Sequence, residues 1–263
     1  MSGASDTSGT GDTGGTGHTG DTNGTSGTSA ESGQRRAGET AARARDARAE
    51  AELRQQIVDT AREMERLGIN QGTSGNVSAR WHDGLLITPS GVPCAALTRE
   101  GIVWMPLDVR DDDPLFEAQR PSSEWRFHRD ILRARPDVKA VVHTHSNAAT
   151  ALAVHGRGIP AHHYMVAAAG GNSIRCAPYA TFGSQALSDH ALEALHERLA
   201  CLLAHHGVIA LGRDLSRALW LAHEVEVLAK QYLLACQLGE PPLLSDAQME
   251  EVIEKFKGYG PRK

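Results

Sequence analysis

The chain has 263 residues, with 27 Lys and Arg against 32 Asp and Glu and a formal net charge of -5. This balance provides no basic surface for nucleic acid, and no apolar run reaches the ~20 residues of a membrane span. The N-terminus lacks the basic and apolar regions of a secretory signal, and four scattered cysteines without a C-x-x-C pair predict a reduced, cytoplasmic protein.

Residues 1–33 are almost entirely Gly, Thr, Ser and Asp, with Thr at every third position from Thr10 to Thr28. Such a segment cannot bury apolar surface and is expected to be disordered. Residues 34–50 are rich in Ala, Arg and Glu and predict a solvated helical lead-in. The predicted organisation is therefore a tail with its lead-in at 1–49 and a folded domain at 50–263.

The folded domain is expected to open with an amphipathic helix, because apolar residues recur every three or four positions from Leu53 to Leu67. Residues 70–78 then form a loop of glycines and small polar residues, which backbone N–H groups could line as in anion-binding loops. Taken alone, this segment is better explained as an ordinary polar turn. Strands are predicted at 77–81, 84–87 and 102–105.

The next helix is predicted to begin within residues 121–128, with a serine at its N-cap and Glu124 in its first turn. A serine there satisfies free N–H groups, and the same end of a helix attracts phosphate. Glu124 has two interpretations. It either favours the helix dipole or reaches a metal ion and acts as a base.

A Val-Val-His-Thr-His sequence ending at His145 carries the strongest chemical signal. Valine favours a strand, and alternate strand residues face the same side, so His143 and His145 could bind one metal ion. A pair of hydrogen-bonded histidines would explain this motif alone equally well. Further ligands are offered by Glu124 and by the adjacent His205 and His206, and together these residues favour a metal site.

Helices are expected at 147–155 and 188–198, and paired strands at 200–204 and 208–211. Asp214 is placed to cap a long apolar-faced helix. The last helix is predicted to start with a capping box at Ser245.

Several segments together resemble the class II aldolase/adducin superfamily. They are residues 70–78, 122–128, 142–145, 163–174, 177–183 and 219–224. The resemblance covers about residues 50–260. It implies a three-layer α/β/α fold with a central, mostly antiparallel sheet, and a C4 homotetramer with active sites between subunits.

The resemblance implies one Zn²⁺ per subunit, held by His143, His145 and His206. Three imidazoles leave an open coordination position, the arrangement of a catalytic zinc site. Glu124 matches a resting ligand that moves away as substrate arrives and then acts as the catalytic base.

The resemblance also assigns substrate-binding residues. Those matching the phosphate site are Gly75, Asn76, Ser90, Gly91, Ser122 and Ser123. Tyr164, Phe182 and Tyr259 match the aldehyde end, with Tyr259 coming from a neighbouring subunit. Either tyrosine would donate the proton to the aldehyde oxygen.

The implied activity is zinc-dependent retro-aldol cleavage of L-fuculose 1-phosphate, or of a close 5-deoxy-ketose 1-phosphate. The products would be dihydroxyacetone phosphate and L-lactaldehyde or a similar small aldehyde. The matching segments contain no lysine that could form a Schiff base, so a metal ion is expected to accept the developing charge.

Three alternatives remain. One is a sugar-phosphate epimerase of the same fold, which carries Asp at the place of Glu124. Another is a methylthioribulose-1-phosphate enzyme, either a dehydratase, which differs around the aldehyde end, or an aldolase. The third is a non-catalytic, adducin-like interaction module, which lacks the complete metal set.

Overall fold

The computed structural model describes residues 27–257, with side chains from residue 43 onward. The chain divides into two units, Met1–Asp46 and Ala47–Lys263. The domain boundary at 49/50 stays a prediction. Residues 27–33 were expected to be disordered but are helical, as part of a helix that continues into the Ala-, Arg- and Glu-rich segment. A helix extends readily from an established turn, which explains the earlier start. The disorder predicted for 1–26 lies outside the described residues.

The helices are α1 (Gly27–Arg66), α2 (Leu115–Ala118), α3 (Trp125–Ala134), α4 (Asn147–Val154), α5 (Gln185–Ala194), α6 (Leu215–Cys236) and α7 (Asp246–Lys257), with short 3₁₀ helices η1 (Cys94–Ala96), η2 (Arg99–Gly101) and η3 (Tyr164–Ala169). The strands are β1 (Asn76–Trp81), β2 (Gly84–Ile87), β3 (Val103–Pro106), β4 (Ala140–Thr144), β5 (Arg175–Ala177), β6 (Ala200–Leu203) and β7 (Gly207–Gly212).

The strands form one sheet in the order β3-β2-β1-β4-β7-β6-β5. Every neighbouring pair is antiparallel except β5 and β6, which are parallel. This arrangement confirms the expected mostly antiparallel sheet. Strands β4 and β7 are adjacent at its centre, and the turn from β6 into β7 lies beside the end of β4.

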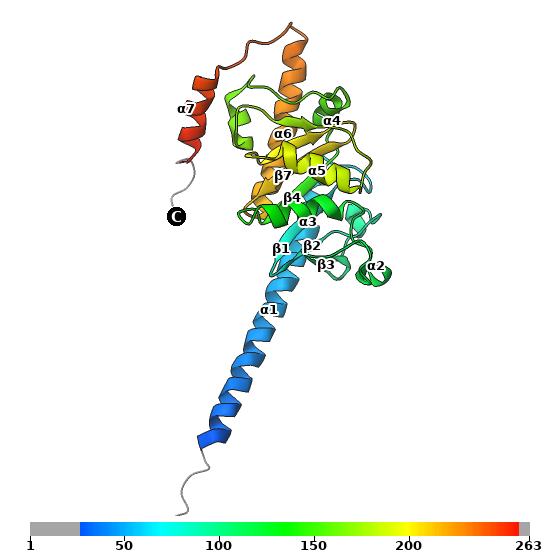
Figure 1. Cartoon of the computed structure of the whole chain (residues 1–263), viewed down its shortest axis with the longest axis vertical. Coiled ribbons are helices and arrows are strands. Elements are labelled where there is room, and N and C mark those ends of the chain that lie inside the picture. Colours follow the sequence, from blue (N-terminus) through cyan, green and yellow to red (C-terminus); the bar gives the residue numbers. More distant parts are fainter. Residues whose placement is uncertain (1–26, 258–263) are drawn as a thin grey trace, which may run out of the picture. The chain divides into compact units, whose positions relative to one another are not determined.

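Alternating side chains of the central strands enter two separate cores, one on each face of the sheet. In β7, for example, Val208 and Ala210 belong to the first core, and Ile209 and Leu211 to the second. Buried residues of α1, α4 and α6 join the first core, and those of α3 and α5 join the second. Figure 1 shows α3 and α5 lying over the central strands. The result is the expected three-layer α/β/α arrangement.

Helix α3 begins within the predicted residues but has a different cap, and α5 begins earlier than predicted. The N-cap of α3 is Glu124 and not a serine, although the Ser122 hydroxyl accepts a hydrogen bond from the Glu124 N–H at 3.3 Å. Helix α5 was expected at 188–198 but begins earlier, because Ser184 caps it by accepting from the Leu187 N–H at 3.2 Å. It also ends earlier, ahead of a turn in which Glu197 has a φ of 55°.

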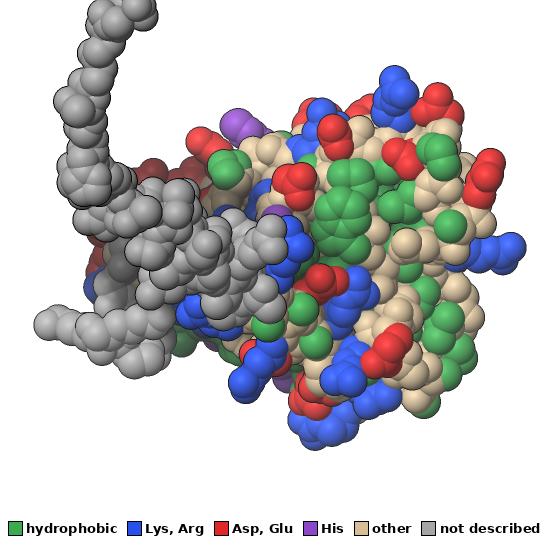
Figure 2. Space-filling model, turned by 90° about the horizontal axis from the view of Figure 1, so that it is seen from below, with side chains coloured by type: hydrophobic (Ala, Val, Ile, Leu, Met, Phe, Trp, Pro, Cys, Tyr) green, Lys and Arg blue, Asp and Glu red, His purple; other side chains and the backbone are tan. Residues whose placement is uncertain are grey.

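The predicted caps of the last two helices are confirmed. The Asp214 carboxylate accepts from the Arg217 N–H at 2.8 Å, and Ser245 and Gln248 exchange the two hydrogen bonds of a capping box. Among the helices of the described part, none is long and apolar enough to cross a membrane. Figure 2 shows acidic and basic side chains interspersed on one face of the molecule.

Candidate active site

Four side chains from three separate segments converge at one end of the central strands. His143 lies on β4, His145 just beyond it, His206 in the turn between β6 and β7, and Glu124 at the N-cap of α3. The three imidazole centroids are 4.8 to 4.9 Å apart. One potential ligand atom from each of the four residues lies within 4.8 Å of all the others. These are the four residues predicted as metal ligands.

The turn before β7 determines which of the two adjacent histidines enters the cluster. His205 adopts a left-handed conformation, with a φ of 56°, and its side chain is exposed, whereas His206 faces Glu124. Gly207 follows, and a Cβ at that position would collide with the Thr144 carbonyl and approach the His145 ring to 3.0 Å. The missing side chain of Gly207 therefore allows the turn to pack directly against the end of β4.

Hydrogen bonding determines which nitrogen of His143 faces the cluster. Its Nδ1 lies 2.9 Å from the Val208 carbonyl oxygen, which can only accept, so Nδ1 carries the proton. Nε2 then faces the cluster and lies 3.0 Å from His145 Nε2 and 3.2 Å from Glu124 Oε2. Three potential ligand atoms thus come together in a buried space, where a proton or a metal ion must lie between them.

The donor set fits a divalent cation. Glu124 Oε1 is buried and has no well-directed hydrogen bond, although His206 Nε2 lies 3.1 Å away. Ligands about 2.1 Å from a tetrahedral ion lie about 3.4 Å from one another, close to the separations seen here. The chemistry and the spacing of these donors therefore indicate a metal centre.

The charge states of two cluster residues also suit metal binding. Burial, followed by repulsion from His143 and His206, lowers the pKa of His145 to about 3, against attraction from Glu124. Burial raises the pKa of Glu124, but attraction and hydrogen bonding from His143 and His206 outweigh it and hold the pKa below its usual range. A neutral imidazole and an ionised carboxylate are the forms that bind metal ions.

A cavity of about 500 Å³ opens beside the cluster, and Glu124, His145 and His206 form part of its wall. All seven predicted substrate-binding residues line it, namely Gly75, Asn76, Ser90, Gly91, Ser122, Ser123 and Phe182. The structure thus brings the predicted phosphate residues and the predicted ligands to the same space.

Backbone geometry explains how these loops meet. Pro89 and Pro121 form an isolated antiparallel bridge, which places the loop containing Ser90 beside that containing Ser122. Gly75 has a φ of 67°, and a Cβ there would lie 2.6 Å from the His143 carbonyl oxygen. A side chain at position 75 would therefore push the loop away from β4 and from the cluster.

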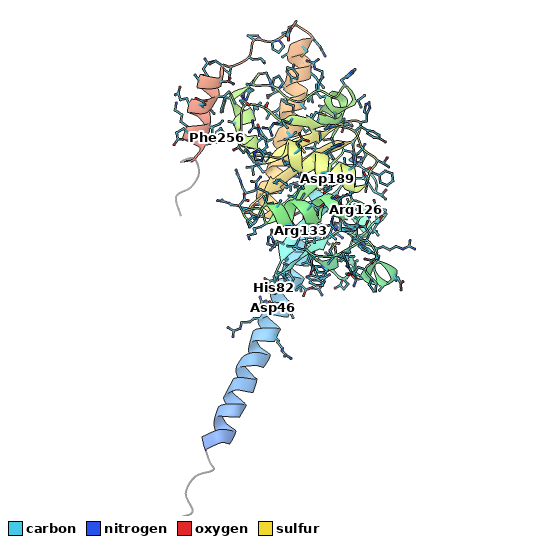
Figure 3. The ribbon with its side chains drawn as sticks, in the orientation of Figure 1. Asp46, His82, Arg126, Arg133, Asp189 and Phe256 are labelled. Carbon is cyan, nitrogen blue, oxygen red and sulfur yellow. The ribbon has the colours of Figure 1, made fainter. Side chains whose placement is uncertain are left out.

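The wall formed by residues 179–182 is tied to the start of α3. Arg126, labelled in Figure 3, donates from Nη1 to the Gly183 carbonyl at 2.5 Å and pairs with Asp111 at 2.7 Å. A Cβ on Gly183 would approach the Ser123 carbonyl oxygen to 2.6 Å. The segment carrying Phe182 is thus packed against the loop that leads into Glu124.

The predicted tyrosines do not join this cavity in the described part of the chain. Tyr164, at the start of η3, is 51% exposed and is not among the lining residues. Tyr259 lies outside the described residues. Their roles stay predictions.

Sequence reasoning missed several residues at the site. Tyr179 and His205 line the cavity, with their rings edge to face and their centroids 5.9 Å apart. Tyr179 lies in a segment that carries the family resemblance and His205 was a candidate ligand, but the sequence assigned neither of them to the cavity. His128 and Ser78 belong to a buried series of hydrogen bonds that leads through Asn76 to Glu124. His128 lies four residues after Glu124 and Ser78 two residues after Asn76, and this spacing could have pointed to them.

Comparisons with known proteins bear on the family and the fold of the chain. The family model described as "Class II Aldolase and Adducin N-terminal domain" matches residues 55–233. The L-fuculose phosphate aldolase of Escherichia coli (strain K12) is 54% identical over 211 residues, which cover 80% of this chain and 96% of that protein.

Two further similarities bear on the substrate and the fold. The 5-methylthioribulose-1-phosphate/5-deoxyribulose-1-phosphate aldolase of Rhodospirillum rubrum is 56% identical over 208 residues, covering 79% of this chain and 92% of that protein. A solved structure of an L-fuculose 1-phosphate aldolase superposes with a TM-score of 0.73 at 36% identity, covering 78% of this chain and 96% of that one.

Proposed function

The chain belongs to the class II aldolase and adducin N-terminal domain family and is a class II aldolase, and from that premise we propose that it performs zinc-dependent cleavage of L-fuculose 1-phosphate. The products are dihydroxyacetone phosphate and L-lactaldehyde. The observation that carries the proposal is the cluster of three imidazoles and one carboxylate in the wall of a cavity lined by small polar residues.

Zinc is the proposed ion, because three imidazoles and a carboxylate are characteristic zinc ligands. When bound, zinc supplies the Lewis acid that polarises the ketose carbonyl and stabilises the negative charge that develops during bond cleavage. His143, His145 and His206 would hold it, with Glu124 as the fourth ligand before substrate arrives.

Glu124 is also the proposed base. Its carboxylate is ionised and borders both the imidazoles and the cavity. In the condensation direction it takes the proton from the carbon next to the dihydroxyacetone phosphate carbonyl, and in cleavage it returns that proton.

The phosphate is proposed to bind among neutral groups. Gly75, Asn76 and Gly91 contribute backbone to the wall, and Ser90, Ser122 and Ser123 offer hydroxyls, since the N–H groups of Ser90 and Ser122 are already donated to the Arg120 and Thr88 carbonyls. No Lys or Arg is among the described lining residues. Backbone amides in such loops bind anions without a formal positive charge, and they fix the reacting end of the substrate relative to Glu124.

We also propose a cytoplasmic C4 homotetramer in which Tyr164 and Tyr259 complete a neighbouring subunit's site. The exposure of Tyr164 and its absence from its own cavity support this arrangement. Mixing inactive Glu124→Gln subunits with inactive Tyr164→Phe subunits should restore activity through hybrid sites. If every mixture stays inactive while hybrid tetramers form, the shared-site arrangement is wrong.

A second candidate substrate class is 5-methylthioribulose or 5-deoxyribulose 1-phosphate, favoured by the similarity to the Rhodospirillum rubrum aldolase. These ketose phosphates differ from L-fuculose 1-phosphate at the end remote from the phosphate. Phe182 and Tyr179, at the cavity wall, are the residues expected to discriminate between them. The epimerase, dehydratase and adducin-like alternatives are not favoured, since the ligand set is complete and the similar proteins described above are aldolases.

The decisive experiment is a retro-aldol assay over a panel of ketose 1-phosphates, with dihydroxyacetone phosphate detected by coupled reduction. His143→Ala and Glu124→Gln should abolish cleavage, and a chelator should remove activity that zinc restores. His155→Ala, which alters an exposed histidine outside the cavity, is the matched control and should stay fully active. A metal-free protein that cleaves at the wild-type rate would refute the proposal.

A further inference from the structure

A line of hydrogen bonds runs behind the carboxylate through the second core. Ser78 Oγ lies 2.7 Å from His128 Nδ1, and His128 Nε2 lies 2.5 Å from Asn76 Oδ1. Asn76 Nδ2 then donates to Glu124 Oε2 at 2.9 Å. Ser78 and His128 are fully buried, and neither lines the cavity.

Secondary structure explains why these four residues align. Asn76 and Ser78 are two apart on β1 and therefore face the same side. Glu124 and His128 are four apart at the start of α3 and therefore lie one above the other. Two residues of β1 thus face two residues at the start of α3.

The protons in this line can be assigned. Burial, followed by repulsion from His143, lowers the pKa of His128 to about 3 despite attraction from Glu124, so the ring is neutral and donates from a single nitrogen. Suppose first that Nδ1 carried the proton. Nε2 would then accept from the Asn76 amide NH₂, and the amide oxygen would face the Glu124 carboxylate, an arrangement of two acceptors in contact.

The other tautomer satisfies every group. The Ser78 hydroxyl donates to Nδ1, Nε2–H donates to the Asn76 amide oxygen, and the Asn76 NH₂ donates to Glu124. Orientation of a buried amide is thereby set by a histidine that never meets the substrate.

We propose that Ser78 and His128 are positioning residues that fix the Asn76 amide and, through it, the orientation of the Glu124 carboxylate toward the three imidazoles. The inference rests on the proposed role of Glu124 as base and ligand. Among the described hydrogen bonds, Asn76 Nδ2 is the one donor to Glu124 Oε2 from outside the group of three histidines. If the Asn76 amide is no longer held in place, Glu124 loses this donor and its carboxylate is free to rotate.

The test uses three variants with different expectations. His128→Leu removes both ring nitrogens at similar volume, and Ser78→Ala removes the hydroxyl that holds Nδ1. His128→Gln keeps an N–H donor near the place of Nε2 and should rescue the function. Ser188→Ala is the matched control, because that hydroxyl is equally buried and makes a 2.7 Å hydrogen bond to Asp130, away from the site.

For the zinc-loaded enzyme we expect His128→Leu to lower kcat by about 10- to 100-fold, the usual effect of losing an outer-shell partner, with KM for the ketose phosphate nearly unchanged. Ser78→Ala should show a smaller loss of the same kind. His128→Gln should stay close to wild type, and Ser188→Ala should lower stability without changing kcat.

A second measurement does not depend on activity. In the metal-free protein, ¹⁵N-histidine NMR should show His128 protonated at Nε2, and crystal structures of the variants should show Glu124 in more than one orientation. If His128→Leu fails to fold, Ser78→Ala and the wild-type tautomer decide the matter. Protonation at Nδ1, or an unchanged Glu124 with unchanged kcat in the variants that fold, would overturn the inference. A wild-type protein with no aldolase activity would refute the proposed function instead.

Discussion

Gly207 shows how a single residue without a side chain shapes the group of candidate metal ligands. It follows His206 directly, and a Cβ at this position would collide with the Thr144 carbonyl oxygen at the end of β4. Gly207→Ala should push the turn away from His145 and lower metal affinity by about 10- to 100-fold, the range for disturbed support of a metal ligand.

Competition with a chromophoric chelator would measure that affinity. Gly101→Ala is the control, since a Cβ there meets only the Thr98 hydroxyl at 3.5 Å. Equal affinities for the two variants would mean that the turn relaxes without moving the ligands.

His128 also makes the stability of the metal-free protein depend on pH. Its pKa is lowered to about 3 in the folded state, chiefly by burial, while an unfolded histidine titrates near 6.5. Between these values only the unfolded chain binds the proton. The contribution of the neutral His128 to the free energy of unfolding is therefore fully present above pH 6.5. As the pH falls toward 3, the free energy of unfolding decreases by at most about 1.4 kcal/mol per pH unit.

Urea unfolding at pH 7, 5 and 4 should show this loss. His145 shifts in the same direction, so the informative quantity is the difference between wild type and His128→Gln. The stability of the wild type relative to His128→Gln should decline as the pH falls. A constant difference would show that His128 takes up its proton without unfolding.

Among individual residues, the four predicted ligands and the seven predicted substrate-binding residues do lie together. Strand periodicity was sufficient to pair His143 with His145. It could not choose between His205 and His206, because that choice depends on a left-handed backbone conformation. The line through His128 escaped prediction, since it depends on β1 packing against α3.

Among the elements, helices α3 and α5 are joined by a buried polar network. Asp130 on α3 accepts from Arg129 Nε at 2.7 Å, and from Gln185 and Ser188 of α5 at 2.8 and 2.7 Å. Asp130→Ala would leave Arg129 Nε and the buried Ser188 hydroxyl without their acceptor, and the Gln185 NH₂ with Asp189 alone, at a cost of about 3 kcal/mol in the free energy of unfolding.

Asp137→Ala provides the comparison. Asp137 forms an ion pair of similar length, 2.8 Å, with Arg135, but its side chain is 61% exposed. Its removal should cost less than about 1 kcal/mol. Denaturant unfolding of both variants would show the contrast, and similar losses would mean that the buried network adds little.

The start of a helix was predictable where a polar side chain caps it. Asp214 and Ser245 mark the starts of α6 and α7, because their side chains accept a hydrogen bond from the backbone N–H three residues later. Ser184 was overlooked, so the start of α5 was placed too late. Strand β5 has only three residues, Arg175 to Ala177, and no periodicity could reveal it.

For the whole molecule, all described site residues belong to the unit Ala47–Lys263. A chain beginning at residue 47 keeps the residues of α1 that are buried among those described, namely Ile57, Val58, Thr60, Ala61 and Met64. We therefore expect it to retain the melting temperature and kcat/KM of the full chain within experimental error. A clear loss in either measurement would assign the first 46 residues a part in folding or catalysis.

The layered architecture could be expected from the family resemblance more than from patterning. Alternating hydrophobicity does not reveal strand order, and the parallel pairing of β5 with β6 joins segments separated by helix α5. What patterning did supply was the approximate position of most of the other strands.

The convergence of Glu124, His143, His145 and His206 has a thermodynamic consequence. An ion held there cross-links three stretches of chain that separate on unfolding, so by mass action it stabilises the native state alone. Above its dissociation constant, each tenfold rise in free ion adds about 1.4 kcal/mol of resistance to denaturation. Scarcity of the ion would therefore lower the free energy of unfolding of the protein.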